Sequence, residues 1–201
     1  KSTCRILLGE EIGELKEYER WIKRYAFRGG NRKSISSGRD VRTVSAAYCP
    51  NAKFVSLDEV ELVSLGINEI KDIDSIQEAV SEKWQYTGNK ILGNSSFVED
   101  SDQVVNSQYV AESYSIENSS YVFASYLNVN TKYSFGSMSS FGLEFTLNTL
   151  RSGNLKRCFE SHICGDGGDL FLTSYCIGCT DLLFCFNLKN KRNCIGNLEL
   201  P

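Results

Sequence analysis

The chain has 201 residues, of which 41% are hydrophobic and 23% charged, and its formal net charge is -3. This composition suits one large or two small globular domains, and it excludes an intrinsically disordered chain. No apolar run approaches the roughly 18 residues of a transmembrane helix, so we expect no membrane association.

The N-terminal sequence and the cysteines indicate the cellular compartment of the protein. The stretch "CRILLGEEIG" turns acidic after a few apolar residues, which is not typical of a signal peptide. The chain begins with Lys1 rather than Met, which predicts a processed chain or a fragment. Cys4 and Cys49 are isolated in the sequence and are interpreted as reduced thiols. This usage predicts a cytoplasmic or otherwise reducing compartment.

Residues 1–93 carry most of the charge and predict a mixed α/β region that caps or docks on the remainder of the chain. Over residues 8–26, apolar residues recur at three- and four-residue steps, which predicts an amphipathic helix that ends at Gly29-Gly30. Residues 53–67 are rich in apolar residues and could form strands. Residues 72–84 predict a second helix, with Asp74 or Ser75 as its N-cap.

Residues 94–201 contain a twelve-residue repeat. The stretches "NSSFV", "NSQYV" and "NSSYV" begin at residues 94, 106 and 118. At the position of the first Asn, every following unit carries a residue that tolerates the left-handed conformation of a turn. These residues are Asn94, Asn106, Asn118, Asn130, Gly142, Asn154, Asp166, Gly178 and Asn190.

Two further columns support a mainly β fold, a parallel β-solenoid of about nine coils over residues 94–201. A small residue recurs from Ser101 to Cys185, and the column two places before it is apolar after its first member, Glu99. Positions two apart point the same way from a strand, so we expect Phe123 and Ser125 to face inward and Ala124 to face outward. The alternative is a β-sandwich in which the period arises by chance.

The twelve-residue register resembles that of short-repeat parallel β-helix proteins, a group that includes twelve-residue antifreeze solenoids. The Thr-x-Thr face of the antifreeze proteins is missing, so the resemblance does not imply that activity. The ending "FCFNLKNKRNCIGN" is similar to the cysteine-bearing ends of repeat proteins from microbes and their viruses. That likeness implies the architecture but no particular function.

A solenoid needs its open ends covered. The N-terminal region could cover one end. We expect the other end, at residues 196–201, to stay open, and this predicts a protein partner or a homo-oligomer.

Six cysteines lie between residues 158 and 194, close to His162, the only histidine. Cys176 and Cys179 have the spacing of a zinc knuckle, so a zinc site is one interpretation. Its candidate ligands are Cys164, Cys176, Cys179 and Cys185. The columns favour reduced interior thiols instead, because the cysteines point several ways. A disulfide between Cys164 and Cys176, which are neighbours in one column, is a third alternative.

Basic residues interleaved with aromatic ones occupy residues 20–42, a pattern typical of nucleic-acid or acidic-partner binding. The alternative is a solvated helix end and loop. The candidate binding residues are Arg20, Lys23, Arg24, Arg28, Arg32 and Lys33.

Another column of the repeat is aromatic in its first five units, and this predicts a ladder that either packs or forms an exposed interaction face. Its members after Phe97 are Tyr109, Tyr121, Tyr133 and Phe145. An exposed face could hold a sugar or a protein.

No serine-hydrolase, nucleotide-binding or zinc-protease motif is present in the sequence. With one histidine and no such motif, we expect no enzyme and no cofactor. The sequence predicts a non-catalytic structural or protein-interaction module within a larger assembly. The alternatives are a nucleic-acid-associated protein that uses residues 20–42, and a polysaccharide-binding or polysaccharide-degrading β-helix.

Overall fold

The protein is a mainly β structure, a parallel β-solenoid of about eight turns with a short N-terminal helical segment. The computed structural model describes residues 5, 9–11, 13–62, 64, 66, 72–128, 131, 134–142, 144–154, 156–163 and 167–201. Within these residues, no helix has the length and apolar character that a bilayer crossing requires.

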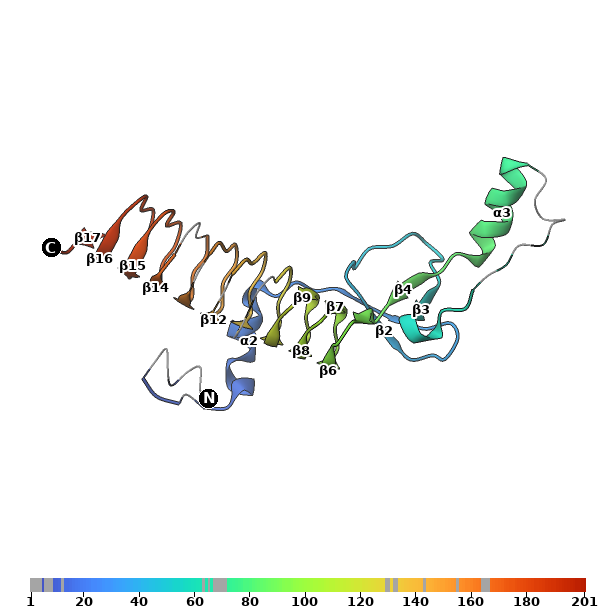
Figure 1. The fold of residues 1–201 in the computed structure, drawn as a ribbon, viewed down its shortest axis with the longest axis horizontal. Helices are drawn as coiled ribbons and strands as arrows, with labels where there is room; N and C mark the ends of the chain where they lie inside the picture. The colour runs from blue at the N-terminus through green and yellow to red at the C-terminus, as the bar shows by residue number, and fades with distance from the viewer. Residues whose placement is uncertain are drawn as a thin grey trace. The chain divides into compact units, whose positions relative to one another are not determined.

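The elements follow one another as helical turns, a small mixed region and then a run of short strands (Figure 1). In chain order they are η1 (Leu15–Tyr18), α2 (Glu19–Ile22), η2 (Lys23–Tyr25), β1 (Gly30–Lys33), β2 (Asp40–Thr43), β3 (Phe54–Ser56), η3 (Leu57–Glu59), α3 (Ile73–Lys83) and β4 (Tyr86–Gly88). The solenoid strands are β5 (Ile91–Leu92), β6 (Ser96–Glu99), β7 (Asp102–Val105), β8 (Gln108–Ala111), β9 (Tyr114–Glu117), β10 (Ser120–Phe123), β11 (Ser134–Phe135), β12 (Phe145–Leu147), β13 (Arg157–Phe159), β14 (Asp169–Phe171), β15 (Thr180–Leu183), β16 (Arg192–Ile195) and β17 (Leu198–Glu199).

Two compact units make up the chain. One comprises Lys1–Arg28 together with Ile91–Pro201, and the other comprises Gly29–Lys90. Strand pairing within the solenoid begins at β5, close to the start predicted from the repeat. The helical turns at residues 15–25 belong to the solenoid unit rather than to the unit that comes after them in sequence.

The unit Gly29–Lys90 is built from two strand pairs and the helix α3. β1 and β2 pair antiparallel, β3 and β4 pair parallel, and Val41 and Val55 are buried. The predicted helix over residues 72–84 is present as α3, but its N-cap is Asp72, whose side chain accepts from the Ser75 backbone N–H. Only β3 forms a strand within the described part of residues 53–67.

Coils stack with the predicted twelve-residue period. Val98, Val110 and Val122 are neighbours on successive parallel strands, and so are Phe159, Phe171 and Leu183 further along. Asn106, Asn118 and Asn190 have positive φ, as predicted for corners. Gly178 has positive φ as well, whereas Asn94, Gly142 and Asn154 do not, and Asn130 and Asp166 lie outside the described residues.

Each regular coil has four corners, because positive φ recurs at every third residue. From Phe97 to Leu127, the residues with positive φ are 97, 100, 103, 106, 109, 112, 115, 118, 121, 124 and 127. The residue after each corner faces inward, so residues 98, 101, 104 and 107 are the inward positions of the first coil. The interior therefore has a period of three.

This period overturns the expectation that Phe123 points inward. Val122 and Ser125 are buried in the interior, while Phe123 is half-buried on the outside. Ala124 is a corner and is nevertheless buried. The alternation of a flat strand fails here because a left-handed residue turns the chain after every two extended ones.

Hydroxyl and thiol ladders satisfy the backbone at these corners. The Ser113 hydroxyl donates to the Ala111 carbonyl at 2.7 Å and accepts from the Ser125 backbone N–H at 3.1 Å. Cys179 makes the same pair of contacts in the later coils, with the Ile177 carbonyl and the Lys191 backbone N–H, both at 3.4 Å. Serine and cysteine are therefore equivalent parts of one ladder.

The predicted helix over residues 8–26 is shorter than expected. Only residues 15–25 are helical turns among the residues described there, and Glu19 pairs with Lys23 at 2.6 Å. The chain turns extended at Ala26, three residues before the predicted stop.

The C-terminal end of the solenoid is partly covered by its own chain, contrary to the expectation of an open end. β17 folds back antiparallel on β16. The Asn197 amide accepts from the Phe186 backbone N–H at 2.9 Å and donates to its carbonyl at 3.0 Å. One predicted coil is lost because the chain reverses after Ile195 instead of completing a turn.

Candidate interaction surface

The N-terminal helical turns lie along one corner of the solenoid, which we call the docking corner (Figure 1). This corner is the column Glu112, Ala124, Gly136, Asn148, Glu160, Leu172 and Phe184, whose members are twelve residues apart. Residues 21–27 contact it and the outward columns on both sides of it. The covered part runs from Glu112 to His162.

Close backbone approach fixes the middle of this contact. A Cβ atom at Gly136 would collide with the Ile22 carbonyl oxygen, and the φ of Gly136 is +65°. Ile22 itself is buried. Ala124 and Gly136 are small because the backbone of the N-terminal segment occupies the space that a side chain would need.

Aromatic contacts flank the docking corner on both sides. On one side, the Trp21 ring lies 6.1 Å from the Phe159 ring. On the other, Phe27 stacks on Tyr126 at 4.3 Å and meets Tyr114 edge-on at 5.8 Å. These ring contacts hold residues 21–27 against the solenoid, so the position of this segment does not depend on the stability of its short helices alone.

Charge pairing occurs at both ends of the covered part. Lys23 Nζ lies 2.5 Å from the Glu112 carboxylate, and Arg24 lies 3.3 Å from that of Glu160. Burial by itself lowers the pKa of Lys23, but the hydrogen bonds that its ammonium donates to Glu112 and Glu19 raise the pKa above its usual value. Lys23 therefore remains a cation at the interface.

His162 is part of the same interface. Its Nε2 is hydrogen-bonded to the Tyr25 hydroxyl, and its Nδ1 lies 3.2 Å from the Ser174 hydroxyl. The two rings meet edge-on. The single histidine thus bridges the N-terminal segment and the next coil.

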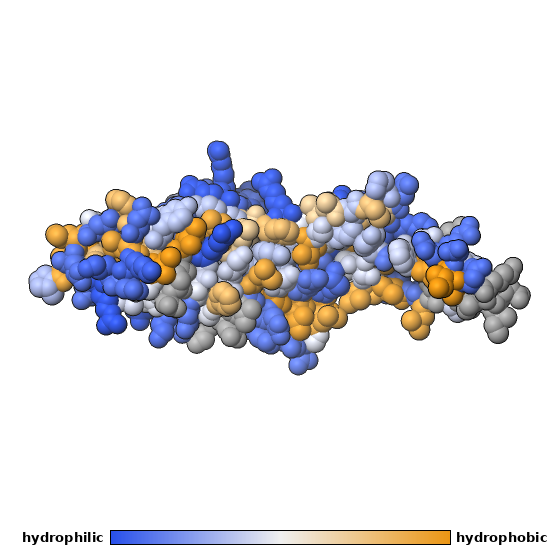
Figure 2. All heavy atoms as spheres, turned by 90° about the horizontal axis from the view of Figure 1, so that it is seen from above, coloured by the Kyte–Doolittle hydropathy of each residue, from blue (hydrophilic) through white to orange (hydrophobic). Residues whose placement is uncertain are grey.

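Beyond this interface, the docking corner and the columns beside it stay largely apolar, and no described segment of the chain covers them. The uncovered part, which we call the apolar strip, consists of Phe171, Leu172, Leu183, Phe184, Phe186, Ile195 and Leu198. Phe184 and Phe186 are each 57% exposed, and Leu198 is 69% exposed. In Figure 2, hydrophobic side chains lie among the hydrophilic ones over the C-terminal coils, at the left of the view.

Register shows that the apolar strip continues the docked surface. Phe159, which contacts Trp21, pairs with Phe171, which pairs with Leu183, which pairs with Ile195. Ser174, the partner of His162, forms a bridge with Phe186. The same columns that hold the chain's own segment therefore run on as an apolar surface.

The predicted aromatic ladder is present over its first three members. The Phe97, Tyr109 and Tyr121 rings are parallel within 2°, with centroids 4.7 and 4.9 Å apart. Neighbouring ring faces cover one another, so Tyr109 and Tyr121 present edges and hydroxyls outward. Phe145 is half-buried and Tyr133 lies outside the described residues.

The described cysteines after residue 157 are free and buried in the interior. Burial, and secondarily the neighbouring Cys185, raise the pKa of the Cys194 thiol. Among the described residues, no group of three or more His, Cys, Asp or Glu is arranged to hold a metal ion. Cys164 lies outside them, so the proposed set Cys164, Cys176, Cys179 and Cys185, like the disulfide alternative, stays a prediction.

The basic candidates are divided between the two units. Arg20, Lys23, Arg24 and Arg28 belong to the solenoid unit, and Arg32 and Lys33 to the other. Besides the pairs of Lys23 and Arg24, Lys33 pairs with Asp40 at 3.1 Å. Arg32 donates to the Ala46 carbonyl at 2.6 Å. These four cations are engaged within their own units.

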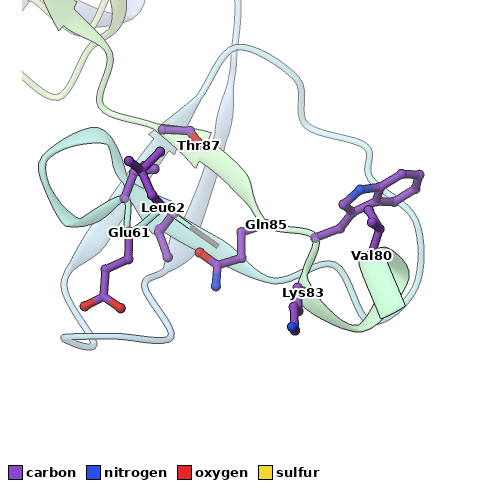
Figure 3. A pocket seen from close by; sticks show the side chains of 9 residues that line it. Glu61, Leu62, Val80, Lys83, Gln85 and Thr87 are labelled. Atoms are coloured by element: carbon purple, nitrogen blue, oxygen red, sulfur yellow. The ribbon is translucent and has the colours of Figure 1, made fainter. Parts of the chain in front are cut away.

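A cavity of about 350 Å³ opens beside the C-terminal end of α3 (Figure 3). Its lining is Val55, Val60, Glu61, Leu62, Val80, Lys83, Trp84, Gln85 and Thr87. Trp84 is 66% exposed and Ile73, at the other end of α3, is 81% exposed. The sequence pattern predicts α3 but not the cavity, because residues 55–62 and 80–87 are distant in sequence.

No protein-family model matches the chain. No curated protein and no solved structure is significantly similar to it either.

Proposed function

We propose that the protein is a non-catalytic interaction module, in which the solenoid is a rigid support and the apolar strip docks a protein segment. The observation that carries the proposal is the continuity of columns from Phe159 to Ile195. One part of this surface holds a helical segment of the chain, and the next part exposes large apolar side chains. Contiguous exposed apolar surface of this kind is typical of protein interfaces.

The position of His162 supports a packing role for the one residue best suited to acid–base chemistry at neutral pH. Both of its ring nitrogens have partners at the interface with the N-terminal segment. The hydrogen bonds position Tyr25 over the coil, as expected of a structural contact.

The two alternative functions have weaker support. Nucleic-acid binding needs cations that are available to phosphate, and Lys23, Arg24 and Lys33 are paired with carboxylates. Sugar binding needs exposed ring faces, and those of Tyr109 and Tyr121 cover one another.

Site-specific photo-crosslinking tests the proposal. Benzoyl-phenylalanine is placed at Phe186 in the strip or at Phe97, an exposed aromatic outside it, and the protein is irradiated both pure and in extract of the producing cells. We expect protein adducts from position 186 that are at least fivefold more abundant than those from position 97. Equal or absent adducts in both samples would show that the strip docks no protein.

A further inference from the structure

We infer that the occupant of the apolar strip is helix α3 of a second copy of this chain, so that copies join head to tail. This inference rests on the proposed function, because it names the partner of the same surface. It is drawn from two apolar surfaces, each of which is exposed within its own unit among the described residues: the strip, and the apolar side of α3 with its adjoining cavity.

The docked part of the surface indicates what kind of segment fits the strip. There the solenoid holds short helical turns with Trp21 against Phe159 and Ile22 against Gly136. The continuation offers Phe171 and Leu183 in the column of Phe159, and Phe184 at the corner. A helix with a tryptophan and branched apolar side chains is therefore the expected ligand class.

Helix α3 has this chemistry. Ile73, Ile76 and Val80 recur at three- and four-residue steps, and Trp84 follows directly after the helix. Ile73, Ile76 and Trp84 are all exposed. The sequences also correspond, since Glu19-Arg20-Trp21 in the docked segment matches Glu82-Lys83-Trp84 at the end of α3.

The strip and the apolar side of α3 both lack the charged residues that pair at the docked part of the surface. Along the covered corner, Glu112 and Glu160 meet Lys23 and Arg24. At the strip the corresponding corner positions are Leu172 and Phe184. We therefore expect the residues of the occupant that face the strip to be uncharged, as Ile73, Ile76 and Val80 are.

The cavity beside α3 adds a complementary shape. It is bordered by Val80 on the helix side and by Leu62 on the other (Figure 3), and Val60 and Trp84 also line it. Because an aromatic side chain fits a cavity of about 350 Å³, Phe184 or Phe186 of the facing copy can enter it while α3 lies on the strip. Such aromatic anchors in apolar pockets dominate binding energies.

The chain between Trp84 and the solenoid is too short for Trp84 to reach the row of Leu183 in its own copy. Six residues lie between Trp84 and Ile91 in the first strand of the solenoid, and the seven Cα–Cα steps that join the two span at most about 25 Å when extended. The row of Leu183 lies seven coils beyond the row of Glu99, roughly 34 Å at about 4.8 Å per coil. Trp84 therefore reaches the row of Leu183 only from a second chain, and a heterologous contact of this kind builds rings or filaments.

The test compares two disabled full-length variants, separately and mixed, by sedimentation over a hundredfold range of concentration. Phe184→Asp with Phe186→Asp disables the strip, Trp84→Asp with Ile76→Asp disables α3, and Phe97→Asp is the control with an equally exposed aromatic. We expect the wild type and the control to form concentration-dependent oligomers. Each disabled variant should associate at least tenfold more weakly.

Mixing the two disabled variants decides the geometry. A head-to-tail contact leaves one intact interface between them, so the mixture should form a 1:1 dimer and nothing larger. A mixture that stays monomeric would show that the strip and α3 do not bind each other, and would overturn the inference. So would a wild type that stays monomeric throughout, or association unaffected by the α3 variant.

Two further arms keep the result interpretable. If the strip variant fails to fold by circular dichroism, benzoyl-phenylalanine at Phe186 must instead crosslink to residues 73–84 of an isotope-labelled second copy. Adducts only to a different protein would overturn α3 as the occupant while supporting the proposed function. Stronger self-association after removal of residues 1–14 with loss of the α3 dependence would identify that segment as the occupant and equally overturn the inference.

Discussion

The early and late coils of the solenoid share one backbone but differ inside and outside. In the early coils, Val104 and Ile116 alternate with serine ladders inside, and stacked aromatic rings stand outside. In the late coils, Leu170 and Leu182 pack with cysteines inside, and the outer columns are apolar. The comparison teaches that the ladder hydrogen bonds and the left-handed corners define the coil, whereas the outer residues define what it binds.

The largest effect is expected from the late interior. Leu182→Ala should lower the free energy of unfolding by about 2–5 kcal/mol, because Leu182 is fully buried among cysteines that cannot fill the space. Urea denaturation measures it, with Leu198→Ala as the exposed control. If the loss were below 1 kcal/mol, the late coils would be loosely packed compared with the early ones.

Gly136→Val should detach the N-terminal segment from the early and middle coils. The new side chain collides with the Ile22 carbonyl and has to adopt a left-handed φ, at a cost of about 1–3 kcal/mol. Limited proteolysis should then cut within residues 15–27. Gly168→Ala is the control, because its Cβ would have no neighbour closer than 3.5 Å; equal protection in both variants would contradict the docking geometry.

One variant in the early coils and one in the late coils test whether serine and cysteine are equivalent in the ladder. Ser113→Ala should cost about 1–3 kcal/mol, since it leaves the Ser125 N–H without its partner and removes one of the two hydrogen bonds that the Ala111 carbonyl accepts. Cys179→Ser retains both ladder contacts, so the change should stay within about 1 kcal/mol. Thermal denaturation of both proteins checks this, and a costlier Cys179→Ser would show that the thiols do more than replace hydroxyls.

Tyr121→Ala should cost about 0.5–1.5 kcal/mol through loss of stacking on Tyr109. The double variant with Tyr109→Ala separates stacking from other effects, because the coupling energy isolates the pair. A coupling near zero would mean that the ladder is a consequence of the register and not a source of stability.

Alkaline pH should weaken the late coils selectively. The pKa of Cys194 is raised above its usual 9.0 by burial and then by Cys185, so the neutral thiol is favoured in the folded state. Its contribution to stability is present below about pH 9 and is lost as the pH rises through the raised pKa. Urea midpoints at pH 8 and pH 10 should therefore fall less for Cys194→Ser than for the wild type, whereas an equal fall would exclude this thiol as the cause.

The sequence by itself determined the parallel solenoid, its twelve-residue period and several corners. This was so because stacked coils place the same demand on the same column, and Asn106, Asn118 and Asn190 meet it with residues that tolerate positive φ. Sequence also identified α3 and the Phe97–Tyr109–Tyr121 ladder, both of which depend on regular local spacing.

Tertiary structure alone decided which columns face inward and what covers the outside. Phe123 and Phe159 have the same apolar character as a core residue, and only the three-residue corner period places them outside. Both side chains contact residues that are far away in the sequence: Lys23 lies over the Phe123 ring, and Trp21 lies against the Phe159 ring. These contacts explain why the two outward positions are apolar. No local pattern reports such a contact, because the free energy of burial depends on which distant segment excludes the water.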